Sequence, residues 1–267
     1  MDFLSLGTAR FAYEEHGAGS TLVFLHPGVG DHRVWGETTT LLPGFHTFAY
    51  DRRGFGFTEC EPQQHSSVSD LTSILDARGI GRSVLVGNSQ GGRIAIDMTL
   101  AYPERIRGLV LMGPAVSGAP WPDDGGAVRE LSIQIEEAEG REDLDAVNRL
   151  EAHLWLDGPE CHEGRVAGVA RELFLDMNGR ALRSGDIGEA VPAPSAWERL
   201  AELQIPVLVL FGAHDVAALR DIAKAIAERA PLGEYRELSG FAHVPQMEDP
   251  KLCAQIISTF TQMLPGA

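Results

Sequence analysis

The chain has 267 residues, of which 44% are hydrophobic, a composition typical of a globular protein and sufficient for one large domain with an insertion. Its 38 acidic and 22 basic residues give a formal net charge of −16, which argues against nucleic acid and anionic membranes as partners. Since residues 1–17 do not resemble a secretory signal and no apolar run is long enough to span a bilayer, we expect a cytoplasmic protein.

Three cysteines, Cys60, Cys161 and Cys253, are widely spaced and form no Cys-x-x-Cys pair. Such a set is typical of free thiols in a reducing compartment. The spacing of His153, Cys161 and His162 matches no metal site that we know, so we expect neither a metal ion nor another cofactor.

The first elements along the chain are two short stretches, 3–6 and 10–14, that alternate apolar and polar residues on either side of a glycine. This pattern predicts an antiparallel hairpin at a sheet edge. Continuous apolar runs then alternate with helix-like segments, at 21–25, 47–50, 83–86, 108–112 and 206–211. Buried strands alternating with helices predict a mostly parallel sheet of eight strands, with helices on both faces.

The middle third of the chain breaks this rhythm. From residue 117 to about 196 the apolar residues follow helical spacing and no strand pattern occurs. Proline-bearing stretches at 120–122 and 191–194 are typical of boundaries. We therefore predict an all-helical cap, residues 117–196, inserted into an α/β core formed by residues 1–116 and 197–267.

The most informative motif is Gly87-Asn88-Ser89-Gln90-Gly91. It follows a predicted strand and precedes a predicted helix, which is the context of a nucleophile elbow. Glycines on both sides of the serine relieve the crowding that such a sharp turn creates. The pattern therefore predicts that Ser89 presents its hydroxyl at the edge of the sheet, above a helix N-terminus.

A serine nucleophile requires a base, and the base requires an orienting acid. Asp215 comes directly after the apolar run 206–211, and His243 lies in a loop after the expected last strand, 234–238. Because parallel strands end at the same edge of a sheet, these residues can converge with Ser89.

Taken together, these stretches resemble the α/β-hydrolases that carry an inserted cap. The resemblance spans nearly the whole core and rests on five stretches, at 26–28, 51–56, 87–92, 212–215 and 240–243. It implies that Ser89 is the nucleophile, His243 the general base and then acid, and Asp215 the orienting carboxylate.

The resemblance also implies an oxyanion hole made of two backbone N–H groups. One belongs to Gln90, the residue after the nucleophile. The other comes from the loop 26–30, where Pro27 has no N–H to donate. Gly28 is therefore our choice for the second donor, with Val29 as the alternative.

Other polar residues near these motifs have more ordinary interpretations. We expect His26 to brace the oxyanion loop, Asp51 and Arg53 to tie loops together, and Asp97 to be solvated or paired. Because substrate pockets are mostly apolar, we expect some residues of the cap and the adjacent loops to line one. The candidates are Val29, Trp121, Trp155, Phe174, Met177 and Val244.

The serine at the elbow narrows the reaction, because relatives that cut carbon–halogen bonds or epoxides use aspartate there. We expect a hydrolase of a small carboxylic ester or lactone, acting as a monomer or homodimer. Asn88-Ser89 and the stretch 111–114 resemble hydrolases of meta-cleavage products, which break carbon–carbon bonds. Two departures weaken that alternative, since 31–37 lacks their asparagine and Val244 replaces their tryptophan. A weakly catalytic receptor of the same fold is the remaining alternative.

Overall fold

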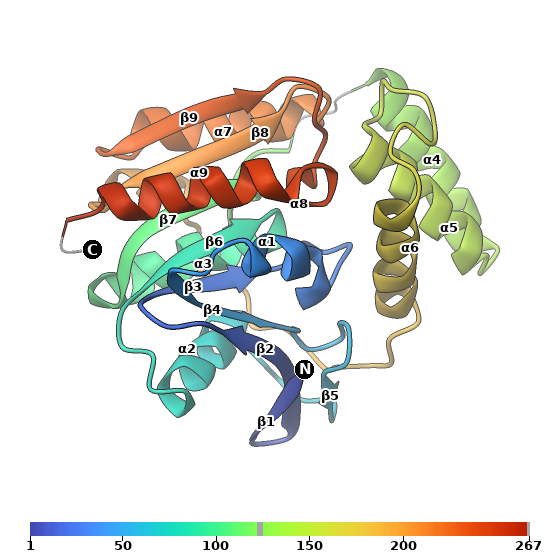
Figure 1. Cartoon of the computed structure of the whole chain (residues 1–267). Coiled ribbons are helices and arrows are strands. Elements are labelled where there is room, and N and C mark those ends of the chain that lie inside the picture. Colours follow the sequence, from blue (N-terminus) through green and yellow to red (C-terminus); the bar gives the residue numbers. More distant parts are fainter. Residues whose placement is uncertain (122–124, 266–267) are drawn as a thin grey trace.

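The computed structural model describes residues 1–121 and 125–265, and within these ranges one sheet contains nine strands. Across the sheet their order is β1-β2-β4-β3-β6-β7-β8-β9, with β5 paired to β2 alone (Figure 1). The strands are β1 (Asp2–Leu6), β2 (Ala9–His16), β3 (Ser20–Leu25), β4 (Phe45–Tyr50), β5 (Glu59–Cys60), β6 (Ser83–Asn88), β7 (Ile106–Met112), β8 (Val207–Gly212) and β9 (Gly233–Leu238).

The pairing agrees with the predicted α/β-hydrolase fold. β1, β2 and β4 pair antiparallel, and β4, β3, β6, β7, β8 and β9 pair parallel. The mostly parallel sheet is therefore confirmed, with one strand more than the eight predicted. The additional strand, β5, has only two residues, which is too short to produce an alternating or continuous apolar pattern.

Helices cover both faces of the sheet. Alternate residues of the central strands point to opposite faces, so Val23 and Leu85 belong to one core cluster and Leu22 and Val84 to another. The first cluster is closed by α2 (Ser67–Ala77), α3 (Gln90–Ala101) and α7 (Ala217–Arg229). The second is closed by η1 (His32–Trp35) and α9 (Pro250–Met263), and α1 (Gly36–Thr40) packs against α9. This double cover explains why these strands are apolar throughout.

Short helical turns and a capped helix complete the core. The turns are η2 (Pro103–Arg105), η4 (Trp197–Glu202) and α8 (Pro245–Glu248). At the start of α9, the Asp249 carboxylate accepts the N–H of Leu252 at 2.8 Å, and Pro250 occupies the first turn. A capping acid followed by proline fixes where a helix begins, so α8 and α9 are held directly after the loop that carries His243.

The segment between β7 and β8 forms a separate group of helices. It contains α4 (Gly126–Gly140), α5 (Leu144–Glu151), a π-helical turn η3 (Ala152–Asp157) and α6 (Val169–Leu182). Figure 1 shows α4, α5 and α6 together on one side of the molecule, apart from the helices that flank the sheet. These helices lie within the predicted cap; part of its first boundary, residues 122–124, falls outside the described residues.

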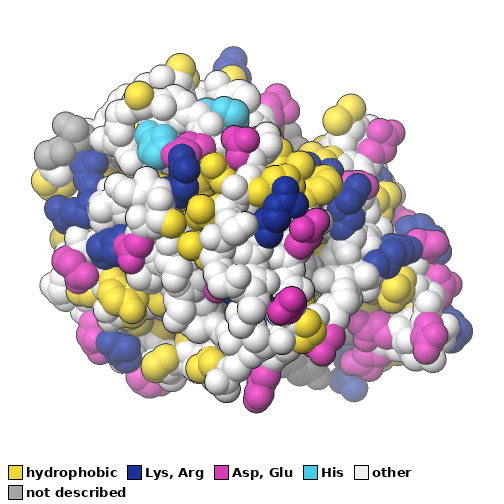
Figure 2. Space-filling view, turned by 90° about the horizontal axis from the view of Figure 1, so that it is seen from below, with side chains coloured by type: hydrophobic (Ala, Val, Ile, Leu, Met, Phe, Trp, Pro, Cys, Tyr) yellow, Lys and Arg dark blue, Asp and Glu magenta, His cyan; other side chains and the backbone are white. Residues whose placement is uncertain are grey.

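The surface charge is mixed on the face that Figure 2 shows. Acidic and basic side chains are interspersed there, so the excess of negative charge is not gathered into one patch on that face. Among the helices of the described residues, none combines the length and apolar character that crossing a bilayer demands.

Candidate active site

Ser89 occupies the turn between β6 and α3 in a conformation that few residues other than glycine adopt. Its φ is +53° and its ψ is −116°. The flanking glycines are required by space, because a Cβ on Gly91 would lie 2.1 Å from the carbonyl oxygen of Leu25, and one on Gly87 would lie 2.6 Å from the backbone of Gly91. This strained turn has the geometry of a nucleophile elbow.

His243 and Asp215 form a buried pair at the same edge of the sheet. The Nδ1 atom of His243 lies 3.0 and 3.1 Å from the two carboxylate oxygens of Asp215. Both side chains are at most 2% exposed. In the described residues no hydrogen bond joins the Ser89 hydroxyl to His243, as is common before substrate binds.

Gly113, directly after β7, makes room for this pair. A Cβ at this position would lie 2.8 Å from the Asp215 carboxylate and 2.9 Å from Nδ1 of His243. The φ of Gly113 is +47°, which also favours glycine. The requirement for glycine comes from packing between distant segments, which local sequence patterns do not reveal.

Asn88 connects the elbow to the histidine loop. Its side-chain amide is fully buried and donates to the backbone carbonyls of Met112 at 2.7 Å and His243 at 3.0 Å. Its carbonyl oxygen accepts from Gln246 at 2.9 Å. The residue before the serine therefore fixes the loop that carries the histidine, a contact between residues 155 positions apart that the sequence did not reveal.

The two residues predicted to supply the oxyanion donors, Gly28 and Gln90, are neighbours in space. A Cβ on Gly28 would come 2.6 Å from the amide nitrogen of the Gln90 side chain. Within the described residues, the backbone N–H groups of Gln90, Gly28 and Val29 donate to no protein acceptor. All three remain available to an oxyanion, and the choice between Gly28 and Val29 remains open.

His26 and Arg52 brace the loop 26–30, which is predicted to supply an oxyanion donor. Arg52 donates to the carbonyl of Pro27 at 2.8 Å and to the side-chain oxygen of Gln90 at 3.0 Å. The Nε2 atom of His26 accepts the backbone N–H of Arg52 at 3.1 Å, so Nδ1 carries the proton and donates to Pro27 at 2.7 Å. Burial and the charge of Arg52 hold the pKa of His26 well below its usual range, consistent with the bracing role expected for this neutral imidazole.

Most of the predicted pocket residues come together between the cap and the core. Val29, Trp155, Phe174 and Val244 belong to one apolar cluster, in which Phe174 and Val244 are fully buried. Met177 is also buried, with its terminal methyl group beside Gly30. Trp121 lies outside this cluster with 56% of its surface exposed, so the structure does not place it with the other candidates.

The helical segment between β7 and β8 contacts His243, the predicted general base, directly. The ring of Trp155, in η3, lies 4.8 Å from the ring of His243, and its carbonyl accepts the backbone N–H of His243 at 3.2 Å. π-helical turns such as η3 are frequent at functional sites. Trp155 is therefore the pocket candidate from this segment for which both a ring contact and a hydrogen bond to His243 are observed.

Arg165 fastens the same part of the cap to the histidine loop. On the cap side it donates to the carbonyls of Asp157 at 2.6 Å and Leu156 at 3.0 Å. On the core side it donates to Gly240 at 2.9 Å and pairs with Glu248 at 2.6 Å. The cap and the histidine loop are thus joined beside the candidate site, which no local sequence signal indicated.

Comparison with known proteins now identifies the family. The model of a family described as "Alpha/beta hydrolase family" matches residues 22–256. The chain belongs to the alpha/beta hydrolase family. This assignment covers most of the core and the cap segment, and it agrees with the elbow and with the sheet order.

Individual relatives differ in the reactions their names describe. The chain is 27% identical, over 94% of its length and 94% of the relative's, to a Bacillus subtilis (strain 168) protein provisionally named 2-succinyl-6-hydroxy-2,4-cyclohexadiene-1-carboxylate synthase. It is 31% identical, over 76% of its length and 74% of the relative's, to a 2-hydroxy-6-oxo-6-phenylhexa-2,4-dienoate hydrolase of Comamonas testosteroni. The crystal structure of an esterase from Rhodococcus sp. ECU1013 superposes with a TM-score of 0.77 at 26% identity, covering 99% of this chain and 98% of that one.

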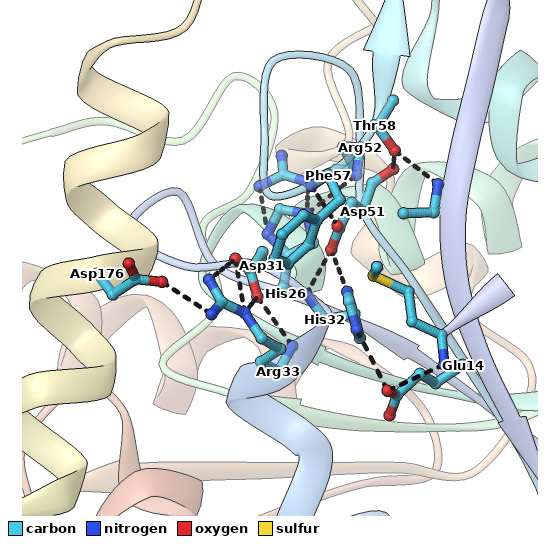
Figure 3. Close-up of polar contacts among 12 residues, drawn as sticks. Glu14, His26, Asp31, His32, Arg33, Asp51, Arg52, Phe57, Thr58 and Asp176 are labelled. Carbon is cyan, nitrogen blue, oxygen red and sulfur yellow. Dashed lines mark hydrogen bonds and ion pairs between the residues drawn. The ribbon is translucent and has the colours of Figure 1, made fainter. Parts of the chain in front are cut away.

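A second polar network of this hydrolase lies beside the oxyanion loop (Figure 3). The Asp51 carboxylate accepts the backbone N–H of His32 at 2.7 Å and contacts its Nδ1 at 2.6 Å. Asp31 is paired with Arg33, which reaches Asp176 of α6 at 2.8 Å. Asp31, His32 and Asp51 are close enough to share one ion, but the Arg33 guanidinium already binds Asp31 and opposes a cation there.

The other polar residues singled out in the sequence are paired within the protein. Asp51 and Arg53 join loops as expected: Asp51 accepts the N–H of Phe57 at 2.8 Å, and Arg53 binds Asp70 of α2 at 2.8 Å. Asp97 accepts the hydroxyl of Ser117 at 2.8 Å. These three residues therefore have structural partners that account for their presence.

Proposed function

We propose that this hydrolase cleaves a small carboxylic ester or lactone through an acyl-enzyme. The observation that carries the proposal is the buried His243–Asp215 pair beside the strained Ser89 turn. The Ser89 hydroxyl attacks the carbonyl, His243 takes its proton and then delivers it to the leaving alcohol, and Asp215 holds the imidazole in the required tautomer. Water then releases the acid by the same steps in reverse.

The backbone supplies the electrostatic part of the proposed reaction. The N–H group of Gln90, at the start of α3, and that of Gly28 or Val29 face the developing oxyanion. Donors held in place before the reaction cost no reorganisation when charge develops, which is why such sites contribute strongly to catalysis. Arg52 and His26 support this role by fixing the loop through Pro27.

A short-chain 4-nitrophenyl ester tests the proposal. We expect hydrolysis that is lost on Ser89→Ala, and covalent labelling of Ser89 by a serine-directed phosphonate. Unchanged turnover by Ser89→Ala would contradict the nucleophile assignment. A folded protein that binds esters but hydrolyses none would favour the receptor alternative.

Carbon–carbon bond hydrolysis is the second candidate function. It is favoured by the Comamonas testosteroni relative, whose name describes a dienoate hydrolase. The same serine and histidine would then act on a ketone rather than an ester. Comparing kcat/KM for a 4-nitrophenyl ester and for a meta-cleavage dienoate decides between them, since we expect the ester to be the better substrate.

A further inference from the structure

A cleft of about 160 Å³ is lined in part by Gln90, the residue that follows the predicted nucleophile in the chain. Three arginines contribute to its walls, Arg52, Arg53 and Arg93, against a single carboxylate, Asp70. That carboxylate is already engaged, because Arg53 binds it through two nitrogens at 2.8 and 3.2 Å. Two guanidinium groups of the cleft are therefore left without an acid of their own.

Arg52 and Arg93 have no ion-pair partner within the described residues. Arg52 is buried and its side-chain hydrogen bonds all go to neutral groups, namely His26, Pro27 and Gln90. Burial lowers the pKa of Arg52 to about 10; the charge of Arg93 adds to this effect, while Tyr50 and the more distant Asp51 oppose it. A buried cation without an ion-pair partner is costly, so a ligand that supplied a negative charge in direct contact would be bound favourably.

Two further polar atoms on this wall are buried without a partner in the described residues: the Tyr50 hydroxyl and the Nε atom of Arg93. Tyr50 is 1% exposed, and burial raises its pKa, so the phenol keeps its proton and is a hydrogen-bond donor. Asp97 interacts electrostatically with Arg93 but lies beyond ion-pair distance of it, and the Asp97 carboxylate accepts the hydroxyl of Ser117. The unsatisfied groups of the cleft are thus donors, and what they lack is an acceptor with negative charge.

We propose that this cleft binds a carboxylate carried by the substrate, with Arg93, Arg52 and Tyr50 as its donors. A carboxylate offers two acceptor oxygens and one negative charge in a volume that the cleft can hold. Gln90 follows Ser89 in the chain, so a group bound along its side chain can belong to the same small molecule that Ser89 attacks. The inference rests on the proposed function and narrows it to esters or lactones that bear a free acid.

Paired substrates that differ only in charge test this inference. In the first pair, 4-nitrophenyl hydrogen adipate and 4-nitrophenyl methyl adipate, the acid is on the acyl side. In the second pair, 4-acetoxyphenylacetate and its methyl ester, it is on the leaving-group side. We expect kcat/KM to favour the acid in at least one pair by about tenfold or more. Equal rates within both pairs would overturn the inference and leave the esterase function intact.

Variants connect the preference to the cleft. Arg93→Gln should remove most of the preference for the acid, and Arg93→Lys should retain part of it. Arg141→Gln, at an exposed position of the cap, loses the same unit of charge and should keep the full preference. If Arg141→Gln lowers the preference as much as Arg93→Gln does, the effect is one of net charge and the proposed site is wrong.

Tyr50→Phe separates binding from folding. Because the hydroxyl has no partner in the described residues, its removal should leave Tm unchanged or raise it, yet lower the acid preference several-fold. A loss of Tm with no change in preference would show a structural role instead.

Adipate itself provides a readout that is independent of turnover. It should raise the Tm of the wild type and of Ser89→Ala, but not of Arg93→Gln. If none of the four esters is hydrolysed, the proposed function fails, and the change in Tm on adding adipate alone decides whether the cleft binds a carboxylate. If the neutral esters are hydrolysed through Ser89 and adipate stabilises no variant, the cleft is not an anion site.

Discussion

At the scale of single residues, the position of Asp215 favours it as the acid that orients His243. It contacts Nδ1 of His243 with both oxygens. The neighbouring strand β7 is followed by Gly113, where a Cβ would lie 2.8 Å from the Asp215 carboxylate, so no second carboxylate fits there. Asp215→Asn should therefore lower kcat for ester hydrolysis on the order of a thousandfold, because the amide favours the wrong imidazole tautomer. Steady-state kinetics on a 4-nitrophenyl ester measure this, and a loss below tenfold would mean that another group orients His243.

The lowered pKa of His26 predicts that the free energy of unfolding falls as the pH falls. Burial and the charge of Arg52 lower its pKa in the folded protein, whereas an unfolded chain takes up the proton near pH 6.5. A lowered folded pKa contributes stability above about pH 6.5, and that contribution is lost as the pH falls further. The loss approaches about 1.4 kcal/mol per pH unit for one proton.

The matched variant for this prediction is His26→Gln, which keeps an acceptor for Arg52 but does not titrate. Urea unfolding at pH 7, 6 and 5 should show a shallower decline in the free energy of unfolding for the variant than for the wild type. The neighbouring His32 shifts the other way: burial lowers its pKa, but Asp51, Asp31 and Glu14 together raise it by more. Its contribution to stability is therefore present below about pH 6.5 and is lost as the pH rises above that value. Parallel declines would mean that His26 is protonated in the folded state.

At the scale of elements, the cap and the histidine loop behave as one unit through Arg165. Its guanidinium joins the end of η3 to Gly240 and Glu248, and Glu248 also accepts the N–H of Ala242 at 2.7 Å. Arg165→Gln should release the loop and lower kcat about ten- to hundredfold with a smaller change in KM, because small displacements of a catalytic group are costly. Arg165→Lys should recover part of the rate.

A second contact between cap and core provides the control. Asp176 of α6 pairs with Arg33 of η1 at 2.8 Å and does not touch the histidine loop. Asp176→Asn should therefore lower Tm without the selective loss of kcat. Equal effects of the two substitutions on kcat would show that cap docking in general, rather than Arg165, positions His243.

At the scale of the whole molecule, the sequence predicted the features that depend on local pattern. The apolar strands, the helical spacing of the cap and the turn at Ser89 follow from neighbouring residues, so the fold and the family could be inferred. Contacts between distant segments could not, because they depend on how the sheet, the cap and the loops pack in space. Asn88 with His243, Arg165 with Glu248 and the arginines of the cleft are of this second kind.

The contact between the cap and the core predicts which cap residues influence the choice of substrate. Trp155 lies against His243 and is only partly buried, whereas Phe174 is fully buried between η3 and Val244. Trp155→Ala should therefore change the ranking of short, long and aromatic esters by about 1 to 3 kcal/mol in kcat/KM. Phe174→Ala should instead cost about 3 to 5 kcal/mol of stability, because it leaves a cavity in the contact between cap and core.

Both variants require a folding control before their kinetics are compared. Tm and the urea midpoint show whether each protein is folded at the assay temperature. A folded Trp155→Ala variant with an unchanged ester ranking would mean that the cap is only a cover. Selectivity would then come from the core, where Gly28 lies on the loop predicted to supply an oxyanion donor and Val244 lies next to His243. Val244→Ala would then be the variant in which the ranking of esters changes.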